Sequence, residues 1–197
     1  MKVWSRRNVQ RGNRKRWVGA TGSLSARLAA AGQRFSVQVL SQGLQALDPD
    51  EASALGLTRL KVGYVREVLL RVDDVAVVFA RSVTAHPHSQ GPWRSIRGLG
   101  TRPLADVLFV QHGIARTPLQ FASLQTASAL HRHVAHAWLD ATGAALASRA
   151  LPARRSVFTR GAAPLLVMEV FAAPDAPWGW LTTKTRRGPP AFPRTKP

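Results

Sequence analysis

The stretch YVREVLLRVDDVAVVFARSVT, residues 64–84, decides the fold of this chain. Both halves are rich in valine, leucine and phenylalanine, which favour strands. The pair Asp73-Asp74 between them is typical of a two-residue hairpin turn. The stretch therefore predicts two antiparallel strands, residues 64–72 and 75–84, joined by a tight turn.

A second hairpin is expected near the end of the chain. Residues 155–159 and the apolar run 165–171 both have strand length, and Arg160-Gly161 separates them. The remaining expected elements lie before and between the hairpins: a helix over residues 24–31 capped by Ser23, a strand over 35–39, a short helix after Asp48-Pro49, a short helix or turn over 103–109, and a helical stretch over 118–151 interrupted by Gly143.

The order of these elements predicts the fold class. Strands follow one another as hairpins, without the regular strand–helix–strand alternation of a parallel sheet. No glycine-rich phosphate loop is found. We expect an α+β fold with a mostly antiparallel sheet and helices packed on one face.

Length and charge suggest one domain between two basic ends. The chain has 197 residues and a formal net charge of +18, and such a charge first suggests a nucleic-acid partner. Residues 1–47 hold nine Lys or Arg and residues 176–197 hold five, with no acid in either segment. We therefore expect a flexible basic extension over residues 1–16, a domain over 17–175 and a Pro-rich basic tail over 176–197. Exposed basic ends bind nucleic acid mainly non-specifically, so no specific nucleic-acid partner is expected.

Composition also limits the chemistry and the compartment. The chain has no cysteine, which excludes disulfides, zinc–thiolate sites and thiol nucleophiles. No apolar run reaches the length of a membrane span, and no hydrophobic segment follows the basic N-terminus as in a secretory signal. We expect a cytoplasmic protein, monomeric and without a membrane span.

Three charged residues interrupt otherwise apolar strands: Arg66, Arg81 and Glu169. A buried charge without a partner costs several kcal/mol, so each must be paired, exposed or bound to a ligand. One interpretation is a structural ion pair or a sheet edge, which is the more frequent arrangement. The other is a pocket on the sheet in which guanidinium groups bind carboxylates and the glutamate handles a hydroxyl or a proton.

The histidines form a second candidate site. His131, His133 and His136 lie within the expected helical stretch, where only His133 and His136 are neighbours on one face. No acid lies nearby before Asp140, and a metal site needs converging ligands. We therefore predict no metal site. No Gly-x-Ser-x-Gly motif suggests a serine hydrolase.

Taken together and in order, the strand motifs resemble the chorismate pyruvate-lyase family. The resemblance covers residues 17–174. Its motifs are an opening helix and strand with GSLSARL at 22–28, YVREVLL at 64–70, FARSV at 79–83, LGTRPLADVLF at 99–109, RRSVF at 154–158 and PLLVMEVF at 164–171. Two departures are visible: Ala105 stands where the family commonly has glycine, and residues 124–151 are longer than in compact members.

The resemblance implies a lyase that splits chorismate into 4-hydroxybenzoate and pyruvate, toward ubiquinone, without a cofactor. It implies that Arg66 and Arg81 hold substrate carboxylate and ether or enolpyruvyl oxygens. Glu169 would contact the ring hydroxyl, as a base or only to position it. Leu104 and Leu24 would lie at the ligand through backbone groups and apolar contact.

Two other functions remain open at this point. Ligand-sensing domains of some bacterial transcription regulators share the fold implied by the resemblance, and they bind small molecules without turnover. Such sensors normally follow a DNA-binding domain, for which residues 1–16 are too short. A nucleic-acid-associated structural protein would rest on the basic ends alone.

Overall fold

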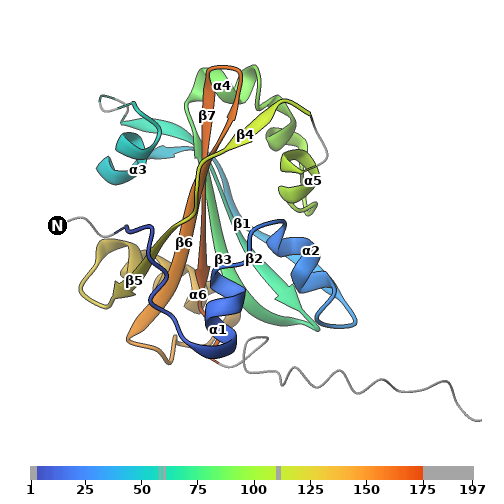
Figure 1. The fold of residues 1–197 in the computed structure, drawn as a ribbon, viewed down its shortest axis with the longest axis vertical. Coiled ribbons are helices and arrows are strands. Elements are labelled where there is room, and N and C mark those ends of the chain that lie inside the picture. The colour runs from blue at the N-terminus through green and yellow to red at the C-terminus, as the bar shows by residue number, and fades with distance from the viewer. Residues whose placement is uncertain (1–3, 58, 60, 110–111, 175–197) are drawn as a thin grey trace, which may run out of the picture.

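The computed structural model describes residues 4–57, 59, 61–109 and 112–174 and is built around one antiparallel sheet (Figure 1). The strand order is β1-β2-β3-β7-β6-β4, and β5 pairs with β6 beside this path. The strands are β1 (Phe35–Ala46), β2 (Val62–Val72), β3 (Val75–Thr84), β4 (Ile114–Arg116), β5 (Gln120–Gln125), β6 (Ala150–Arg160) and β7 (Ala163–Phe171). The helices are α1 (Gly12–Val18), α2 (Leu24–Ala29), α3 (Pro49–Ala54), α4 (His86–Gln90), the 3-10 helix η1 (Arg94–Gly98), α5 (Ala105–Leu108) and α6 (Ala129–Thr142).

Both predicted hairpins are confirmed, and they form the centre of the sheet. Asp73 and Asp74 have φ angles of 48° and 64°, as the two-residue turn between β2 and β3 requires. Gly161, at φ 58°, lies in the turn between β6 and β7. Antiparallel pairing of β3 with β7 joins the two hairpins into one sheet.

One irregularity in the central hairpin controls the positions of the charged side chains. Next to the turn, Val72 faces Val75 and Arg71 faces Ala76, but Leu70 then faces Val78. Val77 is therefore an extra residue in β3, a β-bulge. Because side chains alternate between faces, this one-residue shift moves every later residue of β3 to the opposite face relative to β2.

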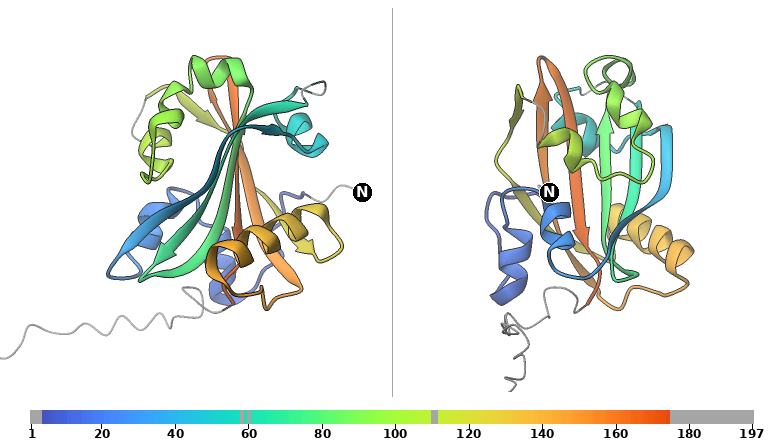
Figure 2. Two further views of the ribbon diagram at one scale, coloured as in Figure 1. Left: turned by 180° about the vertical axis from the view of Figure 1, so that it is seen from behind. Right: turned by 90° about the vertical axis from the view of Figure 1, so that its right-hand side faces the viewer.

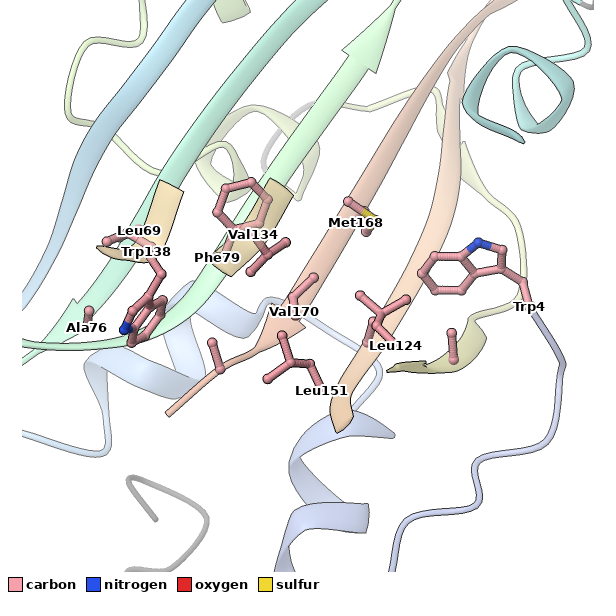
Figure 3. Packing of buried hydrophobic residues seen from close by; sticks show 13 residues of the cluster. Trp4, Leu69, Ala76, Phe79, Leu124, Val134, Trp138, Leu151, Met168 and Val170 are labelled. Atoms are coloured by element: carbon pink, nitrogen blue, oxygen red, sulfur yellow. The ribbon is translucent and has the colours of Figure 1, made fainter. Parts of the chain in front are cut away.

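Helices cover both faces of the sheet, and not one face as expected. On one face, Trp138 and Val134 of α6 pack against Leu69, Phe79 and other residues of one apolar cluster (Figure 3). On the other face, a second apolar cluster combines side chains of α1 and α2 with β2, β3 and β7. Accordingly, α1 lies in front of the sheet in Figure 1, and α6 comes to the front in the view from behind (Figure 2). The α+β class and the antiparallel sheet are confirmed.

Residues 118–151 are only partly helical, which differs from the prediction. Residues 120–125 form β5, which pairs with β6, and α6 begins only after Ser128. The hydroxyl of Ser128 accepts a hydrogen bond from the backbone N–H of His131 and so caps the helix. The alternation of buried Ala122 and Leu124 with the half-buried Phe121 and Ser123 is too short to indicate a strand without its partner.

The described part of the N-terminal segment, which begins at Trp4, packs onto the domain, whereas an irregular extension was expected over residues 1–16. Trp4 is buried, and its indole donates a hydrogen bond to Asp50 at 2.9 Å. Ser5 exchanges two backbone hydrogen bonds with Phe121, and residues 12–16 belong to α1. A tryptophan can bury enough apolar surface to hold a basic segment in place. The predicted tail over residues 176–197 lies outside the described residues.

Candidate active site

The face of the sheet that α1 and α2 cover carries a pocket between Arg66 and Glu169. Arg66 of β2 faces Ser82 of β3, which faces Val167 of β7; Glu169 follows two residues later on the same face. From strand spacing and rise, the two Cα atoms lie roughly 12 Å apart. The two long side chains can therefore approach opposite ends of one small ligand.

Arg66 is buried and held by backbone carbonyls. Its Nη2 donates to Gly100 at 2.8 Å and to Arg102 at 3.1 Å. Its Nε is buried without a hydrogen-bond partner, and among the described residues no carboxylate forms an ion pair with this guanidinium. Burial lowers the pKa of Arg66, although arginine keeps its charge in proteins. A buried cation with a free donor is a ready site for a ligand carboxylate.

Glu169 is held by Arg154 of β6, a residue for which the sequence analysis predicted no role. The Nε of Arg154 donates to Glu169 Oε2 at 2.5 Å, and this guanidinium is almost completely buried. Its Nη1 also donates to the backbone carbonyls of Ala20 and Val18. Arg154 thus fixes Glu169 and ties the segment between α1 and α2 to the sheet.

Leu24, Leu104 and Arg81 also line this pocket, so all five predicted site residues lie along it. Leu24 begins α2, where the Ser23 hydroxyl caps the helix by accepting from the N–H of Ala26. Leu104 directly precedes α5. The other residues lining the pocket come from six strands and from the segments around α2 and α5: Gly22, Ser25, Val37, Val68, Leu70, Ala80, Ser82, Pro103, Ala105, Leu108, Phe109, Arg116, Arg154, Ser156, Phe158 and Val167.

Arg81 differs from the other four because its guanidinium is already paired within the protein, so its predicted role at the ligand stays a prediction. Its guanidinium forms ion pairs with Glu51 and Glu67, at 2.6 Å each, on the opposite face of the sheet. The bulge at Val77 is the cause, because it places Arg81 opposite Glu67. Burial alone would lower the pKa of Arg81, but the two carboxylates raise it above its ordinary value.

Glu67 is the centre of a buried polar network on this second face. Its Oε1 accepts from Arg81 and contacts Nε2 of His133 at 2.6 Å, and its Oε2 accepts from the Ser41 hydroxyl at 2.9 Å. Burial alone would raise the pKa of Glu67, but hydrogen bonds from His133 and Arg81 and their charges lower it from 4.5 to about 2. The network keeps Glu67 charged, and it contains the only ion pair between a histidine and an acid among the described residues.

The depressed pKa of Glu67 predicts a loss of stability in acid. Because the folded pKa lies below the unfolded one, the carboxylate stabilises the fold above pH 4.5, and this contribution falls as the pH approaches 2. Between pH 7 and pH 3 we expect a loss of about 2 kcal/mol in the free energy of unfolding from this group alone. Urea unfolding at pH 7, 5, 4 and 3 measures it.

The matched control for this prediction is the exposed carboxylate of Asp140 on α6. Glu67→Gln is expected to lose most of the fall in stability between pH 5 and pH 3, whereas Asp140→Asn keeps it. Equal pH dependence in wild type and Glu67→Gln would contradict the assignment.

The histidine segment does not form a metal site in the part of the chain that the structure describes. No group of three or more His, Cys, Asp or Glu residues is arranged there to bind a metal ion. His131 contacts the backbone carbonyl of Ser148, and His133 belongs to the Glu67 network. Within the same described ranges, no helix is long and apolar enough to cross a membrane.

Two pocket arginines, Arg154 and Arg116, were missed by the sequence analysis. Arg154 is paired with Glu169, and Arg116 is half-buried with its Nε 2.9 Å from the Ser156 hydroxyl. The sequence contained a signal for Arg154. When the second hairpin pairs Arg160 with Ala163, the register places Arg154 of the motif RRSVF directly opposite Glu169. Arg116 had no such signal, since β4 has only three residues.

The chain is similar to known proteins over most of its length. Residues 8–178 match the family model for chorismate lyase. A protein of Albidiferax ferrireducens named probable chorismate pyruvate-lyase is 95% identical over 197 residues, covering 100% of both chains. A protein of the same name from Cupriavidus metallidurans is 42% identical over 160 residues, covering 81% of this chain and 72% of that one. Among solved structures, the PhnF C-terminal domain is similar in fold, with a TM-score of 0.51 and 17% identity, over 70% of this chain and 82% of that chain.

Proposed function

Because this chain belongs to the chorismate lyase family, we propose that it is a lyase that eliminates pyruvate from chorismate and leaves 4-hydroxybenzoate. The observation that carries the proposal is the buried, unpaired Nε of Arg66 at one end of a pocket whose other end holds Glu169. Chorismate has a ring carboxylate and a hydroxyl on opposite ring carbons. Arg66 binds the carboxylate, and Glu169 accepts a hydrogen bond from the hydroxyl.

The reaction requires little beyond orientation and charge. The bond from the ring carbon to the enolpyruvyl oxygen breaks, and the neighbouring carbon, which carries the hydroxyl, loses its hydrogen as a proton. The electron pair of that C–H bond completes the aromatic ring. Enolpyruvate takes up a proton on its methylene carbon and becomes pyruvate. Aromatisation drives the step, and the pocket supplies alignment and electrostatic stabilisation.

Leu24 and Leu104 shape the apolar walls around the ring and bring the backbone of α2 and α5 close to it. Arg154 is a positioning residue, because it holds Glu169 and does not itself need to touch the ligand. The proposal includes a reaction without an added cofactor, a product used toward ubiquinone and a cytoplasmic monomer.

The test is to mix purified protein with chorismate in buffer containing a chelator and to follow 4-hydroxybenzoate by its ultraviolet absorbance and pyruvate by a coupled assay. We expect both products in equal amounts, at the same rate with and without chelator. Complete loss in chelator that a divalent metal restores would reject the cofactor-free reaction. Tight binding of 4-hydroxybenzoate without release of pyruvate would indicate a sensor.

A further inference from the structure

Arg116 lies in the same pocket, and the roles proposed for Arg66, Glu169 and Arg154 do not involve it. It ends the short strand β4, opposite Phe158 of β6. Its guanidinium lies over the rings of Phe158 and Phe109, at 5.0 and 5.8 Å from the ring centroids. Its Nε donates to the Ser156 hydroxyl. Two aromatic rings and one hydrogen bond thus fix the guanidinium, while its two terminal nitrogens have no hydrogen bond to any described residue.

The charges in the pocket are not balanced by the protein. Four arginines line the pocket, and one of them, Arg81, is paired with Glu51 and Glu67 on the other face of the sheet. The guanidinium groups of the other three, Arg66, Arg116 and Arg154, share one lining carboxylate, Glu169. Arg154 and Glu169 neutralise each other. Neither Arg66 nor Arg116 has an ion pair with any carboxylate in the described ranges. Two buried or half-buried positive charges therefore remain, and such charges need partners. Chorismate carries two carboxylates, whereas 4-hydroxybenzoate carries one.

The hydrogen bond from Arg116 to Ser156 brings its guanidinium toward Glu169, because Ser156 lies two residues from Arg154 on the same face of β6 and Arg154 pairs with Glu169. Burial and the charge of Arg154 lower the pKa of Arg116, while the charge of Glu169 raises it. In chorismate the enolpyruvyl group is bound to the ring carbon next to the one that carries the hydroxyl. With the hydroxyl at Glu169 and the ring carboxylate at Arg66, the second carboxylate lies beside Glu169, and one of the two orientations of the ring about this axis puts it on the side of Arg116.

We propose that Arg116 binds the enolpyruvyl carboxylate of chorismate and thereby distinguishes the substrate from 4-hydroxybenzoate. This inference rests on the proposed function, because it uses the same orientation of the ring. When the ring–oxygen bond breaks, negative charge develops on the departing enolate, and the guanidinium stabilises it. The product 4-hydroxybenzoate has no group at this position, so its binding does not depend on Arg116.

The first measurement compares kcat/KM for chorismate with the dissociation constant of 4-hydroxybenzoate. For Arg116→Gln we expect kcat/KM to fall by about 30-fold or more, as for a charge-assisted contact, while product affinity stays within about 3-fold. Ser156→Ala should lower kcat/KM less, because the Arg116 guanidinium keeps its charge and loses only its hydrogen bond to the Ser156 hydroxyl. Arg132→Gln removes an exposed charge on α6 and is the matched control.

A second measurement does not require turnover. The probe is 3-(carboxymethoxy)-4-hydroxybenzoate, an unreactive dianion that carries its second carboxylate beside the hydroxyl. Wild type should bind it more tightly than 4-hydroxybenzoate, and Arg116→Gln should lose that preference. If wild type fails to convert chorismate but shows this preference, the proposed function fails and the site for the second carboxylate stands.

Two outcomes would overturn the inference itself. One is an equal loss of affinity for both ligands in Arg116→Gln. The other is a lower melting temperature in that variant with unchanged kinetics per folded molecule, which would assign Arg116 a structural role only.

Discussion

Replacement of Arg66 by alanine is expected to weaken the binding of both chorismate and 4-hydroxybenzoate by about 30-fold or more. A buried, charge-assisted contact contributes about 2–5 kcal/mol to binding, and about 1.4 kcal/mol corresponds to a factor of ten in affinity. Both ligands have the ring carboxylate that Arg66 binds, so both should lose affinity. Isothermal titration with the product and steady-state kinetics with the substrate measure the two effects.

Two further variants separate this role from a structural one. Arg97→Ala removes an exposed positive charge that lies over the Tyr64 ring. Arg97 is close in sequence to Gly100 and Arg102, whose carbonyls bind Arg66, and its removal should leave both affinities nearly unchanged. Arg66→Lys keeps the charge but loses the planar donor geometry, so partial recovery is expected. If Arg66→Ala melts early but binds 4-hydroxybenzoate normally per folded molecule, Arg66 does not contact the ligand.

Replacement of Arg81 by methionine is expected to reduce the stability of the fold strongly while sparing the binding of 4-hydroxybenzoate. Its removal leaves Glu51 and Glu67 as buried carboxylates without their shared cation. Breaking a buried ion pair in this way costs about 3–5 kcal/mol, which for a chain of this length lowers the melting temperature on the order of 10 °C. Calorimetry measures this change, and product titration below the melting transition should stay within about 2-fold of wild type.

The compensated variant Glu51→Met, Glu67→Leu, Arg81→Met should recover much of the lost stability, because apolar residues of similar volume often replace a buried ion network without loss. The prediction is wrong if Arg81→Met keeps its melting temperature and loses product affinity. Arg81 would then bind the ligand as the family resemblance implied.

The sequence alone was enough to predict the two hairpins and to identify the family. Residues 64–84 have strand-forming residues on both sides of Asp73-Asp74, and this local pattern is sufficient for a hairpin. Arg66 and Glu169 could be proposed as site residues because a charge inside an apolar strand needs a partner or a ligand. By contrast, β5 and β4 were not predicted, because short strands form only against a neighbouring strand, here β6.

Which charges share the pocket was decided only by the tertiary structure. A regular two-residue turn would place Arg81 directly opposite Arg66, on the same face. The single extra residue, Val77, moves Arg81 to the other face, where it meets Glu67. Arg154 takes the place nearest Glu169, and Arg116 reaches the same pocket from a strand of three residues. Side-chain direction in a sheet depends on register, and register is a property of paired strands that a single strand's sequence does not contain.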